Sequence, residues 1–447
     1  APTLLLFVTN LKMVNISFLG GCREIGRSAI LIESKSGAKC MLDYGIRFHG
    51  EERLPYNANM DNLKAVALTH SHIDHSGALP FLYKTKKIPL LTNSITLAIS
   101  EILIKDMIKI SNYNYPFGYR ELEYLIQNSI FLKNGNRQKI HDNFYLTFID
   151  AGHIPGSVSI LIEVDNKKIL YSGDINSQIT NLVNPANPNN GHKLDSVIME
   201  STYALKEHPP REQLEKEFVE KTINITDNGG RVLIPAFGVA RSQEALLILE
   251  KFDYNGKIFI DGLARKISML YLDYPDFLKN SKQFRRALKK TQFVSKPKTR
   301  STIKKTNGVI ISPSGMLRGG TAIDYIQSIL PDHSSAVYLV GYQVEGTPGR
   351  RLLDEGIFEF KESRKNREIS LDLKIKAKCD YDYFDFSSHS DNSHIHQYIE
   401  SLNFNENSNR DIFCVHGDNK STTRLASELV KKRYNSVAPE TGEIYQV

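Results

Sequence analysis

The sequence predicts an α/β protein in which two mixed sheets lie between layers of helices, joined to a smaller doubly wound domain. Three observations support this fold class. Short apolar strands dominate the first half, with helices between only some of them. After Tyr203, strands and helices alternate, as in a parallel sheet. The 447 residues exceed one ordinary hydrophobic core, so two domains, or one inserted in the other, are expected.

Each element expected in the first part is a short apolar run or a longer segment between two such runs. Strands are expected at residues 14–19, 28–32, 38–42, 65–68, 89–91, 144–148, 159–163, 168–171 and 196–199. Helices are expected at about 96–110 and 119–127. This order indicates an αββα sandwich rather than a purely parallel sheet.

The second part begins with a polar amphipathic helix and continues with buried strands. The expected elements are a helix at 211–224, a strand at 231–235, a helix at 242–252, a strand at 257–260, a basic helix near 277–290, and strands at 308–311 and 336–340. Glycine-rich turns at 313–315, 319–320 and 346–349 mark strand exits, where doubly wound domains place ligands.

Composition narrows the classes of partner. The formal charge is +7, and residues 279–305 alone hold eleven Lys or Arg and no Asp or Glu. Such a run is usually a solvated surface, but beside a hydrolytic metal site it becomes a candidate for binding phosphates. The four cysteines show no Cys-x-x-Cys spacing, which favours a reducing cytoplasm. No apolar run is long enough to cross a bilayer, so we expect a soluble protein without a membrane partner. We assign no role to residues 1–12.

The most informative motif follows the expected strand at 65–68. His70, His72, Asp74 and His75 fall within six positions. Residues i and i+2 at a strand end share a face, so His70 and His72 can bind one ion while the chain turns and delivers the other two to a second position. Imidazole with carboxylate favours zinc. A surface accident is the alternative, but four ligand-type residues after a buried strand make it a poor one.

Other strand ends offer further ligands. His153 and Asp174 each follow a strand, and they are the economical choices for a third ligand and for a carboxylate that bridges two metals. Asp43 also ends a strand; it either orients a ligand histidine or caps a turn. His389 and His416 follow apolar residues late in the chain. The remaining histidines are expected at the surface: His49, His141, His192, His208, His333, His394 and His396.

The His-x-His-x-Asp-His run resembles the motif of the metallo-β-lactamase superfamily, and the order of the later residues resembles its β-CASP nucleases. Strings at 19–28, 199–203 and 234–238 resemble the nuclease subunit of the cleavage and polyadenylation specificity factor, in its short archaeal form without KH domains. The resemblance implies a metallo-β-lactamase αββα sandwich with an inserted doubly wound β-CASP domain. The implied boundaries are 1–203 and 387–447 for the first domain and 204–386 for the second.

The resemblance also implies a ligand set and a chemistry. Two Zn²⁺ ions would be held by His70, His72 and His153, and by Asp74, His75 and His416, with Asp174 bridging them. Asp74, Glu200 and His389 would be catalytic, with His389 as the general acid and Glu200 orienting it. The RNA contacts expected from the basic stretch and the turn after 312 are Arg285, Arg286, Lys289, Lys290, Arg300 and Arg318.

The implied activity is hydrolysis of single-stranded RNA in RNA 3′-end processing or decay, by an endonuclease that can also act as a 5′–3′ exonuclease. A homodimer or an RNA-processing complex is the expected assembly. Three alternatives stay open: a catalytically silent RNA-binding subunit, a DNA nuclease, and a small-molecule metallo-hydrolase. His416 favours RNA, because the DNA-processing branch of the family replaces this histidine.

Overall fold

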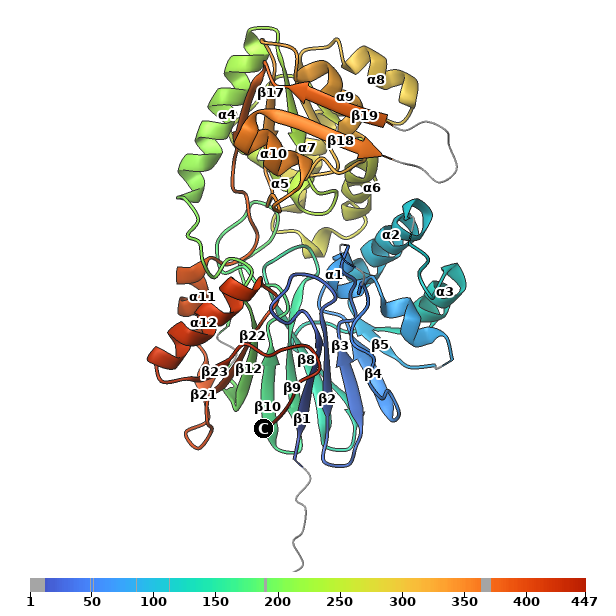
Figure 1. Cartoon of the computed structure of the whole chain (residues 1–447), viewed down its shortest axis with the longest axis vertical. Helices are drawn as coiled ribbons and strands as arrows, with labels where there is room; N and C mark the ends of the chain where they lie inside the picture. The colour runs from blue at the N-terminus through green and yellow to red at the C-terminus, as the bar shows by residue number, and fades with distance from the viewer. Residues whose placement is uncertain are drawn as a thin grey trace, which may run out of the picture.

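The computed structural model describes residues 13–48, 50, 52–85, 87–111, 113–188, 191–362 and 371–447. The segment 1–12 and His49, predicted at the surface, lie outside the described residues. Figure 1 shows two bodies stacked along the long axis of the molecule: the lower contains both ends of the described chain, and the upper contains its middle part. The chain therefore leaves the lower body and later returns to it.

The first sheet of the lower body has seven strands and contains both the first and the last strand described. In spatial order they are β24 (Ile444–Gln446), β1 (Asn15–Gly20), β2 (Ala29–Glu33), β3 (Lys39–Leu42), β4 (Leu63–Ala67), β5 (Leu90–Thr92) and β6 (Ser129–Phe131). From β24 to β3 the pairing is antiparallel, and from β3 to β6 it is parallel. The parallel pair β3 and β4 therefore delivers Asp43 and the histidine-rich run to the same edge.

The second sheet also has seven strands. They are, in order, β23 (Asn435–Val437), β22 (Asp411–Val415), β12 (Ser196–Glu200), β10 (Lys167–Tyr171), β9 (Val158–Val164), β8 (Phe144–Asp150) and β7 (Arg137–His141). Because β10, β12 and β22 are parallel, their carboxyl ends lie together, and Asp174, Glu200 and His416 come at or just after those ends. The short strands β11 (Lys193–Leu194) and β21 (Asn403–Phe404) pair with each other in a separate two-stranded ladder.

Apolar side chains fill three layers of the lower body. Between the sheets, Phe18 of β1 meets Phe413 of β22 with ring centroids 5.2 Å apart. The outer face of the first sheet is covered by α1 (Ile73–Ser76), α2 (Ser94–Ile110), α3 (Tyr119–Gln127) and the 3₁₀ turn at Leu79–Tyr83. The outer face of the second is covered by α11 (Asn392–Glu400) and α12 (Asn419–Lys431) (Figure 1). The predicted αββα sandwich is confirmed.

The upper body is built on a six-stranded sheet in which every pair is parallel. Its order is β15 (Thr291–Phe293), β14 (Ile258–Ile260), β16 (Gly308–Ser312), β13 (Arg231–Pro235), β17 (Ala336–Leu339) and β20 (Asp380–Tyr383). The central strand β16 is buried along its whole length, as expected when helices cover both faces.

Both faces of this sheet are covered, so the domain is doubly wound. One face carries α4 (Arg211–Asp227), α5 (Arg241–Lys251), α6 (Gly262–Tyr271) and α7 (Ser281–Lys289). The other carries α8 (Pro297–Ile303), α9 (Ala322–Ile329), α10 (Pro348–Glu355) and the hairpin of β18 (Ile357–Glu362) and β19 (Leu371–Lys376). The basic helix expected near 277–290 is shorter, because a 3₁₀ turn at Pro275–Phe277 precedes it and Asn280 caps its start.

One apolar cluster joins the two bodies. Ile95 and Ile99 of α2, with Ile154 and Leu182 from loops of the lower body, pack into the cluster that covers one face of the six-stranded sheet of the upper body, here called the third sheet. The loops that carry the candidate site residues of the lower body therefore lie close to the upper one. Among the described residues, no helix combines the length and the hydropathy needed to span a lipid bilayer.

Candidate metal centre

The histidine-rich run forms a loop and a short helix rather than the end of a strand. β4 ends at Ala67, and α1 begins at Ile73 with His72 as its N-cap. The expectation that His70 and His72 share one face of a strand is therefore wrong, because the chain has already turned out of the sheet. The turn still brings the two rings together, with His70 Nε2 3.2 Å from His72 Nδ1.

A first cluster gathers four ligand-type side chains around one point. His70, His72, His153 and Asp174 each offer an atom within 4.8 Å of the others. His153 Nε2 lies 3.1 Å from His72 Nδ1, and Asp174 Oδ2 lies 3.5 Å from His70 Nε2. His153 follows β8 and Asp174 follows β10, so the convergence is produced by the ends of three strands.

A second cluster lies beside the first and consists of Asp74, His75 and His416. His416 Nε2 is 3.2 Å from His75 Nε2 and 3.3 Å from Asp74 Oδ2. The other oxygen of Asp174, Oδ1, lies 3.3 Å from His75 Nε2 and 3.2 Å from His416 Nδ1. The carboxylate of Asp174 therefore directs one oxygen at each cluster, which is the geometry of a bridging ligand.

The donor set fits a pair of divalent cations. Asp174 is 2% exposed, and its Oδ1 has no hydrogen-bond partner within the described residues. A buried carboxylate oxygen that makes no hydrogen bond is costly even beside two imidazole rings, and a cation removes that cost. Imidazole nitrogens with carboxylate oxygens are ligands of zinc and of related transition metals.

Protonation in the first cluster also suits a metal. Burial lowers the pKa of His70 and His153 well below the ordinary value and lowers the pKa of His72 to about 4, so these rings are neutral. Burial opposes ionisation of Asp174, but His416 and His75 outweigh it and hold its pKa well below the usual range. Neutral imidazole and ionised carboxylate are the forms that bind metals.

Attraction between imidazole and carboxylate groups holds the second cluster together. Burial alone would lower the pKa of His75, but Asp174 and Asp43 outweigh it and raise that pKa well above its usual value. The pKa of His416 is raised as well, chiefly by Asp174 acting against burial. For Asp74, burial opposes ionisation, but a hydrogen bond from His416 brings its pKa to about 2.

Asp43 supports the site from behind and is fully buried. Its Oδ2 accepts hydrogen bonds from His75 Nδ1 at 2.7 Å, from the Thr69 hydroxyl at 2.8 Å and from the Tyr171 hydroxyl at 2.9 Å. Its Oδ1 accepts from the Thr69 amide at 2.8 Å. Of the two roles left open by the sequence, the structure places Asp43 where it orients a histidine of the second cluster.

His416 is held in an uncommon backbone conformation. Its φ is +50°, a region that residues other than glycine rarely adopt. The amide of His416 donates to the Gly21 carbonyl at 2.6 Å, and the His416 carbonyl accepts from the Ser201 amide at 3.3 Å. The turn within the glycine-rich string at 19–28 therefore fixes the backbone of this histidine.

His389 and Glu200 form a pair at the rim of the two clusters. His389 Nδ1 donates to Glu200 Oε1 at 2.9 Å, and its Nε2 lies 4.0 Å from Asp174 Oδ2. Glu200 also accepts from the amides of Ile175 and Thr202, which fix the carboxylate. No candidate ligand set among the described residues contains His389, whereas Glu200 appears in one with Asp174 and His416.

Two histidines predicted at the surface are buried, so that prediction is wrong for them. The His208 side chain is 4% exposed; its Nε2 donates to the His389 carbonyl at 3.1 Å, and its Nδ1 lies 3.1 Å from Asp385 Oδ2. His396 is 9% exposed and pairs with Glu428. Both stand in polar stretches, and only the return of the chain to the lower body buries them.

The six expected RNA contacts do not form one patch. Arg285, Arg286, Lys289 and Lys290 are exposed on or just after α7, on one face of the third sheet. Arg300 lies on α8, across that sheet, and its guanidinium binds the carboxylates of Asp261 at 2.6 Å and Asp324 at 3.0 Å. Arg318 is exposed in the turn after β16.

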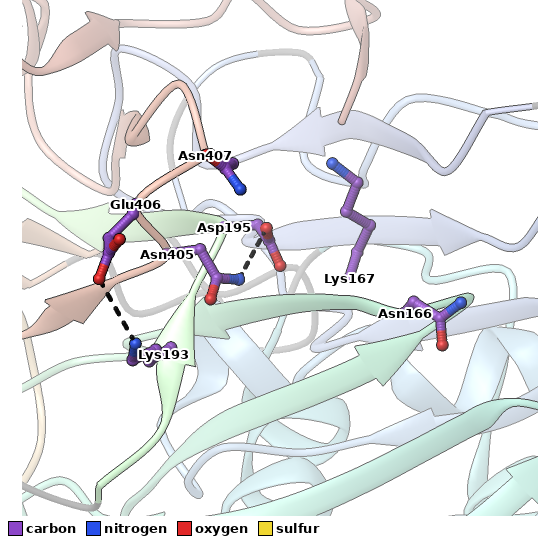
Figure 2. A pocket seen from close by; sticks show the side chains of 7 residues that line it. All are labelled: Asn166, Lys167, Lys193, Asp195, Asn405, Glu406 and Asn407. Atoms are coloured by element: carbon purple, nitrogen blue, oxygen red, sulfur yellow. Dashed lines mark hydrogen bonds and ion pairs between the residues drawn. The ribbon is translucent and has the colours of Figure 1, made fainter.

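A polar hollow of about 440 Å³ lies at the other end of the second sheet (Figure 2). Lys167 begins β10 and Asp195 immediately precedes β12, whereas the candidate ligands come after the carboxyl ends of these strands. Asn405 donates a hydrogen bond to Asp195, and Lys193 forms an ion pair with Glu406 at 3.8 Å; both interactions are drawn in Figure 2. This hollow contains none of the candidate site residues.

Three family models and a solved structure match this chain. The family model of the metallo-beta-lactamase superfamily matches residues 28–210, that of the Beta-Casp domain matches 242–352, and that of the Zn-dependent metallo-hydrolase RNA specificity domain matches 374–439. A crystal structure of a protein of unknown function from Enterococcus faecalis V583 shares the fold, with a TM-score of 0.61 and 13% identity over 97% of this chain and 100% of that one.

Relatives at least 30% identical to this chain come from archaea, and the first of them matches it over nearly its whole length. The protein named Probable RNase MJ4 of Methanocaldococcus jannaschii is 33% identical over 96% of this chain and 99% of its own length. RNase aCSPSF2 of Saccharolobus solfataricus is 34% identical over 77% of this chain and 70% of its own length, and Transcription termination factor FttA of Pyrococcus abyssi is 32% identical over 76% and 58%. The chain therefore belongs to the metallo-β-lactamase superfamily and, within it, to the family that carries a Beta-Casp domain.

Proposed function

We propose that this protein is a zinc-dependent ribonuclease that hydrolyses phosphodiester bonds of single-stranded RNA in 3′-end processing or decay. We assign it endonuclease activity, with 5′–3′ exonuclease activity as a second mode. The observation that carries the proposal is the position of Asp174, whose two oxygens face two adjacent clusters of ligand-type side chains. The names of the relatives support RNA as the substrate.

The proposed ligands are those that the motif predicted. His70, His72 and His153 would hold one Zn²⁺, Asp74, His75 and His416 the second, and Asp174 both. Two divalent cations there would lower the pKa of a water between them and neutralise the phosphate oxygens. The short separations between the donor atoms support this assignment.

Two side chains of the protein supply and orient the proton that the leaving group needs. The attacking water would lose its proton to solvent first; in-line attack by the resulting hydroxide forms one phosphorus–oxygen bond and breaks the bond to the ribose 3′-oxygen, which takes up a proton as it leaves. We assign this step to His389, because Glu200 binds its Nδ1 and leaves Nε2 on the side of Asp174. The products carry 5′-phosphate and 3′-hydroxyl ends. Since the ribose 2′-hydroxyl takes no part, any preference for RNA must come from binding.

The proposal extends to the setting of the enzyme. We place the inserted domain at 204–386, supported by a separate sheet whose strands lie between Arg231 and Tyr383. We place the protein in the cytoplasm, in keeping with four cysteines that are all free. A homodimer or an RNA-processing complex stays a prediction, which light scattering of the purified protein would test.

The test is cleavage of labelled RNAs by protein of measured zinc content. Two zinc ions per chain, cutting of linear single-stranded RNA and opening of a circular RNA are expected. A 5′-monophosphorylated and a 5′-triphosphorylated substrate reveal exonuclease action. Zinc without any RNA cleavage would indicate a silent subunit, faster cutting of single-stranded DNA a DNA nuclease, and turnover of a chromogenic lactam instead of RNA a small-molecule hydrolase.

The role of His389 has its own test, the substitution His389→Ala. We expect cleavage to fall by roughly 10²- to 10⁴-fold, the usual contribution of a general acid, with both zinc ions retained. The matched control is His333→Ala, outside the site, which should leave both unchanged. Loss of zinc from the His389 variant would make this residue a ligand and refute its assignment as the acid.

A further inference from the structure

A row of rings leads outward from His389, away from the metal clusters. The ring of His389 lies nearly parallel to that of Tyr203, with centroids 5.9 Å apart and an interplanar angle of 30°. Tyr203 in turn meets Tyr342 edge to face at 5.7 Å. Tyr203 is 2% exposed, whereas Tyr342 is half-buried and therefore presents part of its ring to solvent. Tyr342 is the accessible end of the row.

A cation lies over the same accessible ring. The ammonium of Lys206 is 5.0 Å from the centroid of Tyr342 and 5.8 Å from that of Tyr203. The Lys206 side chain is exposed, while its backbone is fixed, with the amide donating to the Tyr203 carbonyl at 3.0 Å and the carbonyl accepting from Asn392 at 3.0 Å. Lys206 can therefore move its charged end without moving the chain.

Tyr342 stands where its fold places ligands. It comes three residues after the end of β17, at the carboxyl edge of a parallel sheet, where doubly wound domains bind ligands. Burial raises the pKa of the Tyr342 hydroxyl, the carboxylates of Asp418 and Glu345 act in the same direction, and Arg350 opposes them. The two carboxylates disfavour a phosphate against this ring but have little effect on a neutral base, so the ring is suited to a base and Lys206 to a phosphate.

We propose that Tyr342 and Lys206 form a nucleotide subsite. The base of the nucleotide on the 5′ side of the cleaved bond stacks on Tyr342, and Lys206 binds the phosphate of that nucleotide. This inference rests on the proposed ribonuclease activity. The side follows from the chemistry assigned to His389: the oxygen that it protonates is the 3′-oxygen of the upstream nucleotide. Stacking on a base exceeds an exposed cation–ring contact in strength, so the base displaces the ammonium, which then pairs with the backbone.

The subsite selects single strands over duplex and tolerates every base. An aromatic face stacks on any nucleobase, whereas a base inside a duplex is already stacked on its neighbours. The preference for single-stranded RNA would then arise one nucleotide away from the metals. Tyr342 and Lys206 bind substrate in this account and take no part in bond cleavage.

The experiment is a double-mutant cycle in which one change is made in the protein and the other in the RNA. Binding of a single-site RNA and of the same RNA lacking the base 5′ to the cut is measured by fluorescence anisotropy in the His389→Ala background, which blocks turnover. Removing the base should weaken binding by about tenfold, Tyr342→Ala should do the same, and the two together should cost no more than either alone. Additive losses would overturn the proposal, as would coupling to an abasic position 3′ of the cut.

Matched variants separate stacking from folding and from charge. Tyr342→Phe keeps the ring and should bind both RNAs as the parent does, and Tyr124→Ala, an exposed tyrosine on α3, should change nothing. Lys206→Met should reduce the slope of log affinity against log salt by about one. The cut position is mapped with the wild-type enzyme, so absence of cleavage would refute the proposed activity, whereas normal cleavage with uncoupled binding losses would refute the subsite alone.

Discussion

Asp43→Asn is the sharpest test of how the second cluster is held. Asp43 Oδ2 accepts from His75, the Thr69 hydroxyl and Tyr171, and Oδ1 accepts from the Thr69 amide. An asparagine keeps the size but replaces one oxygen with an amide that can only donate. The better orientation leaves its oxygen facing three donors and its amide facing the Thr69 N–H.

Two losses follow from that geometry. One buried N–H loses its acceptor, which costs about 1–3 kcal/mol of folding stability. The His75 imidazole loses the charge that orients it, and substitution of such a supporting partner typically weakens metal affinity by about 10- to 100-fold. Asp43→Asn should therefore bind zinc more weakly and unfold at a lower temperature than the wild type.

Zinc affinity is measured by competition with a chromogenic chelator, and stability by thermal unfolding of the metal-free and zinc-loaded forms. Asp142→Asn, an exposed aspartate paired with Lys139, is the control and should match the wild type. Zinc affinity within twofold of the wild type in the Asp43 variant would refute the reasoning, because it would show that His75 is oriented without its carboxylate partner.

Three further results are expected. Glu200→Gln should retain both zinc ions and lower kcat by roughly 100-fold, since His389 loses the partner that orients it; loss of zinc would make Glu200 a ligand. Replacing Arg285 and Lys289 together by alanine should weaken RNA binding and lower its salt slope by about one to two, and an unchanged slope would show that α7 is only a solvated surface. Burial raises the pKa of Glu428, but hydrogen bonds such as that from Arg424 lower it to about 2, below its ordinary 4.5. Its stabilisation is therefore complete above pH 4.5 and lost as the pH falls toward 2, so the melting-temperature gap between wild type and Glu428→Gln should shrink from pH 7 to pH 3; a constant gap would contradict this assignment.

Spacing in the sequence was enough to locate most of the candidate ligands, because these residues follow buried strands: parallel pairing aligns the ends of β10, β12 and β22, whereas His153 follows the antiparallel strand β8. His70 and His72 converge although the strand-face argument for them was wrong, since the turn that follows β4 does the same work. Tyr342 and His208 could not be found in this way. Their neighbours along the chain are unremarkable, and each reaches the site only through contacts between the two bodies.

Most of the strands that were predicted are central and buried. Of those that were not, β7 has no fully buried residue, and β20 reads Asp-Tyr-Asp-Tyr yet pairs in parallel with β17. The helix α8 went unpredicted for a similar reason, since Ile303 is its one buried residue. In these segments tertiary pairing decides the structure, and local pattern carries little information. The strand β22 was not predicted either, although it is buried and lies inside the second sheet.

The distance along the chain between the members of the second cluster has a consequence during synthesis. Asp74 and His416 meet although 342 positions separate them. At typical rates of translation, about 5–20 residues per second, a ribosome needs roughly 17 to 70 seconds to pass from one to the other. Throughout that interval the second cluster lacks His416, so this cluster is completed only after almost all of the polypeptide has been synthesised.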